Sequence, residues 1–110
     1  MKEIETWEAK IYCGLRRECS DFSWPICVVY QTCQDFIKVN PWCVTVTPTR
    51  FLYKGGWENG AIIGIIQYPR FPKSIESLKT KTIKLAEELK EVLQQFRVSV
   101  VFPDVTVLVE

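Results

Sequence analysis

The fold is decided by residues 61–102, which read AIIGIIQYPRFPKSIESLKTKTIKLAEELKEVLQQFRVSVVF. Residues 61–68 are almost continuously apolar and predict a buried strand. Ser74 is typical of a helix N-cap, and the apolar residues of 78–96 then recur at steps of three and four, which predicts an amphipathic helix. Residues 97–102 predict a further strand, so the stretch is a strand–helix–strand unit.

The residues before this unit repeat the same kind of order. Apolar and polar side chains alternate over 6–16, which is typical of a half-buried strand. Ser23 as N-cap and Pro25 in the first turn predict a helix that ends at Asn40-Pro41. Residues 43–53 then predict a second strand, rich in Val, Thr, Phe and Tyr.

Three details refine this outline. Pro48 cannot donate to a ladder, so its strand is expected at a sheet edge. Residues 54–60 are glycine-rich and predict a hairpin connection somewhat longer than the tight two-residue kind. Residues 105–109 alternate again, so the chain ends either in one strand or in a hairpin.

The predicted order is therefore βαββαβ. This order is that of an α+β, ferredoxin-like open sandwich, with an antiparallel sheet, two helices on one face and strand order 4-1-3-2. The chain has 110 residues, of which 47% are hydrophobic and 25% are charged, and we expect one globular domain over 1–110.

The net charge of +1 implies no general affinity for nucleic acid or membranes. No apolar run approaches the roughly 20 residues of a transmembrane helix, and residues 1–10 lack the apolar core of a signal peptide. We therefore expect a cytoplasmic protein, in a bacterium or in an infected host cell.

The chain has five cysteines, no C-x-x-C pair and no histidine. An odd number argues against a disulfide framework, and the spacing argues against zinc, so we expect mostly buried thiols, no metal and no cofactor. Without histidine every histidine-dependent mechanism is excluded, which favours a non-enzymatic protein, although Lys, Tyr, Cys or a carboxylate could still catalyse a reaction. The alternative nucleophile is Cys19, which follows Arg16 and Arg17 in an electropositive loop.

The fold suggests where a ligand would bind. We expect the first and third strands to lie side by side and parallel, so that their carboxyl ends meet. Six residues that bear charge or an aromatic ring would gather there: Arg16, Arg17, Tyr68, Arg70, Lys73 and Arg97. With Trp57 of the hairpin as a stacking group, they would form a site for an anionic, nucleotide-like ligand. The alternative is that these residues are ordinary solvated loop residues.

The open face of the sheet bears on the oligomeric state. Residues 61–68 are apolar on both faces, whereas helices of the same chain cover only one face. We therefore expect a second copy of the chain on the other face, in a homo-oligomer. The alternative is that residues 105–109 fold over it.

Residues 43–72, CVTVTPTRFLYKGGWENGAIIGIIQYPRFP, followed later by VSVVFPD, resemble small phage- and prophage-encoded proteins of unassigned function. The element order is similar to that of oligomeric ligand binders of the nitrogen-regulatory PII type, although the long PII nucleotide loop is absent. These resemblances imply a small binding protein that sequesters a nucleotide signal used in antiviral defence.

Three functions follow. The favoured one is a non-enzymatic homo-oligomer that binds an anionic small ligand. The alternatives are a protein-interaction module or inhibitor of a host factor, acting through the open sheet face or the hairpin that carries Trp57, and a histidine-independent small enzyme.

Overall fold

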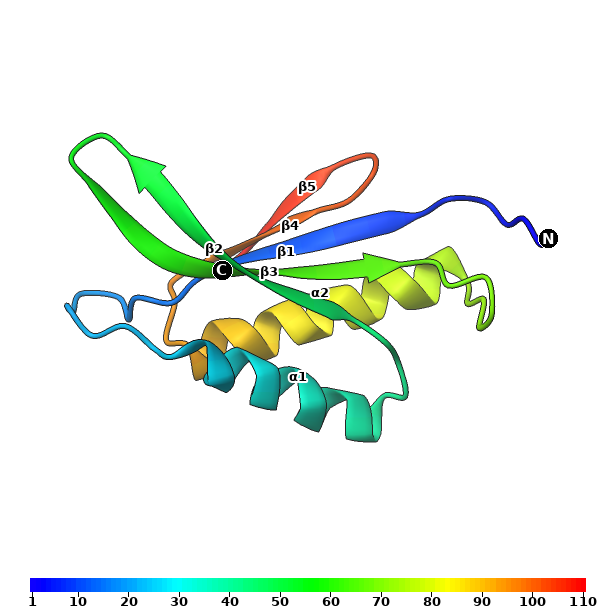
Figure 1. Ribbon diagram of the computed structural model, residues 1–110, viewed down its shortest axis with the longest axis horizontal. Helices are drawn as coiled ribbons and strands as arrows, with labels where there is room; N and C mark the ends of the chain where they lie inside the picture. The colour runs from blue at the N-terminus through cyan, green and yellow to red at the C-terminus, as the bar shows by residue number, and fades with distance from the viewer.

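The computed structural model describes residues 1–110 and contains five strands and two helices. The elements follow the predicted order and are β1 (Glu8–Gly14), α1 (Ile26–Val39), β2 (Thr45–Tyr53), β3 (Gly56–Ile66), α2 (Ile75–Val92), β4 (Val98–Val101) and β5 (Thr106–Val109). The strands form one sheet in the order β2-β3-β1-β4-β5, and both helices cover the same face of it (Figure 1). The ferredoxin-like α+β prediction is confirmed, and β5 extends the sheet as the second strand of a C-terminal hairpin.

The hydrophobic core lies between the sheet and the helices. Alternation places the odd-numbered residues of β1 and β3 on the helix side, where Ile11, Ile63 and Ile65 are fully buried. Leu85 and Leu89 of α2 are fully buried against them. The even-numbered residues of β1 and β3 lie on the other face, which no helix covers and which we call the open face.

The two helices begin differently. Ser74 is the N-cap of α2, and its hydroxyl oxygen accepts a hydrogen bond from the Ser77 N–H at 3.1 Å, as predicted. The predicted cap Ser23 is wrong, because Pro25 is the N-cap of α1 and no side chain caps this helix. Ser23 instead forms an isolated antiparallel bridge with Arg16, which ties the loop before α1 to the end of β1.

The β2–β3 connection is tighter than predicted. Tyr53 pairs with Gly56, so only Lys54 and Gly55 form the turn, and Gly55 adopts a φ of 86° that favours glycine. Residues 56–60 therefore belong to β3, not to a loop. The paired strands continue beyond the helices as an arm, and β2 is the edge strand expected from Pro48 (Figure 1).

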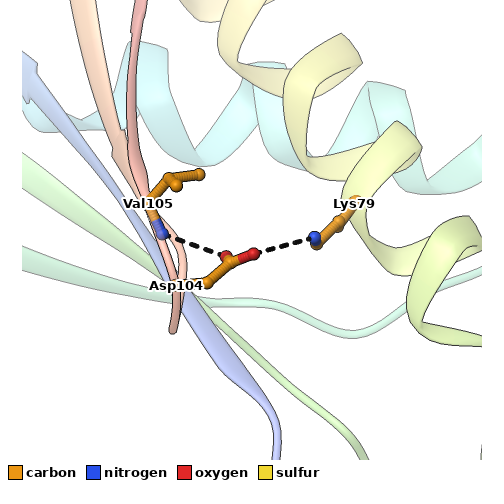
Figure 2. A network of polar contacts seen from close by, with 3 residues as sticks. All are labelled: Lys79, Asp104 and Val105. Carbon is orange, nitrogen blue, oxygen red and sulfur yellow. Dashed lines mark hydrogen bonds and ion pairs between the residues drawn. The ribbon is translucent and has the colours of Figure 1, made fainter.

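The β4–β5 turn contacts α2 through an ion pair between Asp104 and Lys79. The Asp104 carboxylate accepts hydrogen bonds from the Val105 N–H at 3.0 Å and from Lys79 Nζ at 3.5 Å (Figure 2). Its own backbone N–H and these partners hold the pKa of Asp104 below its ordinary value. The contact is exposed, so it orients the hairpin more than it stabilises the fold.

All five cysteines are free thiols, as expected, but the expectation that most are buried is wrong. Only Cys13 and Cys33 are buried, because Cys19 lies in a loop, Cys27 faces outward in the first turn of α1 and Cys43 precedes β2. Neither helix is both long enough and apolar enough to cross a membrane.

The prediction that the first and third strands run parallel is wrong, and this changes the predicted site. β1 and β3 are antiparallel, not parallel, with Glu8 opposite Ile66 and Gly14 opposite Gly60. The reason is the crossover through α1, which makes β2 run parallel to β1. β3 returns antiparallel to β2 and inserts between the two strands. The carboxyl ends of β1 and β3 therefore lie at opposite ends of the sheet.

Candidate functional site

The predicted cationic cluster is divided between the two ends of the sheet. The carboxyl end of β1 leads to Arg16 and Arg17, and β4 begins there beside Arg97. The carboxyl end of β3 leads, at the opposite end, to the remaining predicted residues Tyr68, Arg70 and Lys73. The single anion site expected from the sequence is thus not formed, because the antiparallel pairing of β1 and β3 separates its two halves.

Trp57 lies on the arm and does not join either group. Its ring is 54% exposed and is covered on one side by the Arg50 guanidinium, 4.2 Å from the ring centroid. Arg50 Nε also donates to the Asn59 side chain at 3.4 Å. Trp57 precedes Glu58 in an extended strand, so these two side chains lie on opposite faces of the arm.

A different cluster occupies the open face at the carboxyl end of β1. Gly14 and Gly60 are opposite one another in β1 and β3, and neither has a side chain to fill the surface. A Cβ atom at Gly60 would overlap the Phe51 ring, and one at Gly14 would lie 2.7 Å from Glu58 Oε2 and 3.2 Å from Gln95 Oε1. The two glycines thus make room for an aromatic ring, a carboxylate and an amide, which we call the glycine site.

The free polar groups of the glycine site are hydrogen-bond acceptors. Gln95 is 8% exposed, and its Nε2 donates to the carbonyl oxygens of Arg16 at 2.7 Å and Leu93 at 3.2 Å. These bonds use its donors and leave Oε1 as the group that faces Gly14. The half-buried Glu58 carboxylate has no hydrogen-bond or ion-pair partner in the structure. Two acceptor groups without donors suit a ligand that carries positive charge or N–H groups.

Aromatic rings lie next to these acceptors. Tyr12 and Phe51 are 6.5 Å apart between ring centroids with an interplanar angle of 52°. Ser99 pairs with Tyr12, and the two strands are antiparallel. Arg97, two residues before Ser99, therefore falls beside Gly14, two residues after Tyr12. Of the predicted site residues, Arg97 is therefore the one whose strand position adjoins the glycine site, with Arg16 held nearby through its carbonyl.

The opposite end of the sheet has a cavity of about 310 Å³, which we call the aromatic cavity. Predicted residues Tyr68 and Lys73 line it, together with Trp42 and Phe71, whereas Arg70 lies outside against the Phe71 ring at 5.3 Å. No carboxylate lines this cavity, and Lys73 is its one charged residue. The glycine site thus contains a carboxylate, whereas the charge of the aromatic cavity is that of a lysine.

Sequence reasoning missed the residues of the glycine site: Tyr12, Gly14, Phe51, Glu58, Gly60 and Gln95. A signal was present, because a glycine inside a strand often marks a close approach of another group. Two such glycines, in strands expected to be neighbours, would have indicated a shared opening on the sheet surface.

The fold as a whole is shared with two solved structures of a phage SAM lyase. The lyase in complex with S-methyl-5′-thioadenosine has a TM-score of 0.71 and 19% identity, over 94% of this chain and 88% of that chain. The lyase in its apo state has a TM-score of 0.71 and 22% identity, over 94% of this chain and 87% of that chain. No family model matches the sequence, and no curated protein matches it either.

These similarities correct the favoured function and agree with the resemblance to phage proteins. A non-enzymatic binding protein was expected because the chain lacks histidine, yet the neighbouring structures with this fold are of an enzyme. The non-enzymatic expectation is therefore wrong, and the alternative of a histidine-independent enzyme fits the findings better. A small nucleotide-like ligand agrees with the thioadenosine bound by the neighbour.

Proposed function

We propose that this chain is a phage SAM lyase, which cleaves S-adenosylmethionine and releases S-methyl-5′-thioadenosine. The observation that supports it most strongly is the fold match over 94% of the chain to phage SAM lyase with that thioadenosine bound. The glycine site supports it further, because its free acceptor groups and aromatic rings suit a positively charged nucleoside.

S-adenosylmethionine carries a sulfonium and an ammonium as positive groups, one carboxylate, and an adenosine. In the proposed complex the unpartnered Glu58 carboxylate attracts the positive groups, and Gln95 Oε1 accepts from an N–H of the substrate. Tyr12 and Phe51 offer ring faces to the sulfonium or the adenine, and Arg97 is placed to meet the carboxylate. The aromatic cavity fits less well, because Lys73 would repel a sulfonium.

The reaction explains why histidine is not needed. The bond between sulfur and the aminobutyryl carbon breaks, and its electron pair stays on sulfur, which becomes a neutral thioether. As this bond breaks, an oxygen of the substrate's own carboxylate bonds to the same carbon and closes a lactone, so all atoms are retained and neither water nor a proton acceptor is required. A neutral thioether leaves without protonation, so no general acid is required at the leaving group.

We also propose that the chain forms the homo-oligomer expected from the sequence, with a second copy on the open face. The open face carries half-exposed apolar side chains on three of the five strands, β3, β4 and β5: Ile66 (40% exposed), Val101 (37%) and Leu108 (47%). The glycine site opens on this face, so a second copy packed there would shield the reacting sulfonium from water. Exclusion of water strengthens the electrostatic interactions inside a site. We further propose that the chain acts as one domain in the cytoplasm of an infected bacterium, where removing SAM would deprive host defence enzymes that use it.

The test is direct. Purified protein is incubated with S-adenosylmethionine, and S-methyl-5′-thioadenosine is quantified by liquid chromatography with mass spectrometry. We expect Glu58→Gln to lower kcat/KM by about 100-fold, the usual scale for losing one preorganised electrostatic contact. Glu87→Gln on the exposed surface of α2 is the matched control and should retain full activity. Absence of thioadenosine with the folded wild-type protein would refute the proposal.

A further inference from the structure

We infer that the aromatic cavity is a second small-molecule site, which takes a planar apolar ligand bearing one anionic group. The cavity lies between residues 41–43, which precede β2, and residues 66–73, which are the last residue of β3 and the loop after it. It is at the opposite end of the sheet from the glycine site, so the inference does not depend on the proposed lyase activity.

The wall of the cavity is held in a fixed shape. Gln67 Nε2 donates to the Lys73 carbonyl at 2.6 Å, and the Lys73 N–H donates to Gln67 Oε1 at 2.9 Å. The Phe71 N–H donates to the Tyr68 carbonyl at 3.0 Å, which closes a turn inside this loop. The nitrogen and the oxygen of the Gln67 carboxamide thus both bond to Lys73 and join the two ends of the loop, so the site is organised before a ligand arrives.

The lining favours a flat apolar ligand. Six of the nine lining residues are hydrophobic, and Trp42, Tyr68 and Phe71 present aromatic rings. Its volume of about 310 Å³ lies at the small end of the range of ligand pockets, about 300–1,000 Å³. Trp42 packs against Phe36 at 6.1 Å, and its buried indole N–H has no partner in the protein.

The charge around the cavity specifies an anion. Lys73 is the one charged residue of the lining, and Arg70 lies over the outer side of Phe71. Burial first, and then the positive charge of the nearby Lys73, lower the pKa of Lys81. Cys43 beside it and burial raise the pKa of Tyr68 to about 12.

The experiment compares two probes that differ in one charge. Indole-3-acetate carries a carboxylate, whereas indole-3-ethanol has the same ring system and no charge. Isothermal titration calorimetry should show indole-3-acetate binding about tenfold more tightly, the scale of one charge-assisted contact. Lys73→Gln should remove that preference without weakening the binding of indole-3-ethanol. The matched control Lys84→Gln, on the exposed surface of α2, should preserve the preference.

The location is read independently by NMR. Indole-3-acetate should shift the indole N–H signal of Trp42 and leave that of Trp57, on the distant arm, in place. Equal affinity for the two probes, an unchanged preference in Lys73→Gln, or no binding at millimolar concentrations would each overturn the inference. Glu58→Gln should bind indole-3-acetate normally, so failure of this inference and failure of the lyase proposal are distinguishable.

Discussion

The pair of glycines opposite one another on the open face gives a prediction whose size follows from the structure. A Cβ at Gly60 would overlap the Phe51 ring and lie 2.7 Å from the Cys13 carbonyl oxygen. The carbonyl belongs to the backbone of β1, the central strand of the sheet, and cannot move aside cheaply. Overpacking of this kind costs about 1–3 kcal/mol, and the reduced freedom of the unfolded chain returns about 0.4–1 kcal/mol. We therefore expect Gly60→Ala to lower the free energy of unfolding by about 1–2 kcal/mol.

Gly14→Ala should behave differently, although the two residues face each other. Its Cβ would meet the end of the Glu58 side chain, which has no partner and can rotate away, and would lie 3.2 Å from Gln95 Oε1, a contact that a small shift relieves. The free energy of unfolding should therefore change by less than about 0.5 kcal/mol. The displaced carboxylate should nevertheless reduce cleavage of S-adenosylmethionine in the assay above.

Urea unfolding followed by tryptophan fluorescence measures both variants, and thermal unfolding provides a second reading. If Gly60→Ala is as stable as the wild type, the Phe51 ring does not lie over Gly60 and the description of the glycine site is incorrect. If Gly14→Ala loses as much stability as Gly60→Ala, the argument that flexible side chains can yield at Gly14 is refuted.

Further predictions concern the thiols, the helix caps and the clamped loop. Burial raises the pKa of Cys13 to about 12 and that of Cys33 to about 11. At pH 8 Ellman's reagent should therefore react with three thiols in the folded protein and with all five in urea. Fast reaction of five thiols in the folded protein would contradict the burial of these two cysteines. Ser74→Ala should lower the free energy of unfolding by about 1 kcal/mol, because it removes the cap of α2. Ser23→Ala should change it by less than about 0.5 kcal/mol, because Ser23 caps no helix. Equal losses in urea titrations would argue against Ser74 as the capping residue. Gln67→Leu removes both bonds of the clamp and should cost about 1–3 kcal/mol, with faster amide exchange at Lys73 measured by NMR; unchanged exchange would show that the clamp does not hold the loop.

Local patterns in the sequence were sufficient for the order of elements. Alternation over 6–16 predicted β1, spacing by three and four predicted α2, and Ser74 predicted where that helix begins. Each of these signals depends on neighbours in the chain, within about one or two turns of helix or a few residues of strand. Ser23 failed as a cap for a related reason, because its pairing with Arg16 competes with the helix for the same residue.

The sequence by itself thus determined the order of the elements and which residues of each strand are apolar. Only the tertiary structure decided which strands run parallel, and with that which side chains meet. Because β3 inserts antiparallel between β1 and β2, it carries Tyr68, Arg70 and Lys73 away from Arg16 and Arg97 and brings Glu58 to Gly14. The glycine site joins residues from β1, from the β2–β3 arm and from the segment between α2 and β4, and no periodicity along the chain predicts that these residues meet. The physical reason is that a side chain's direction follows from its own backbone, whereas its neighbours across a sheet follow from the path of the whole chain.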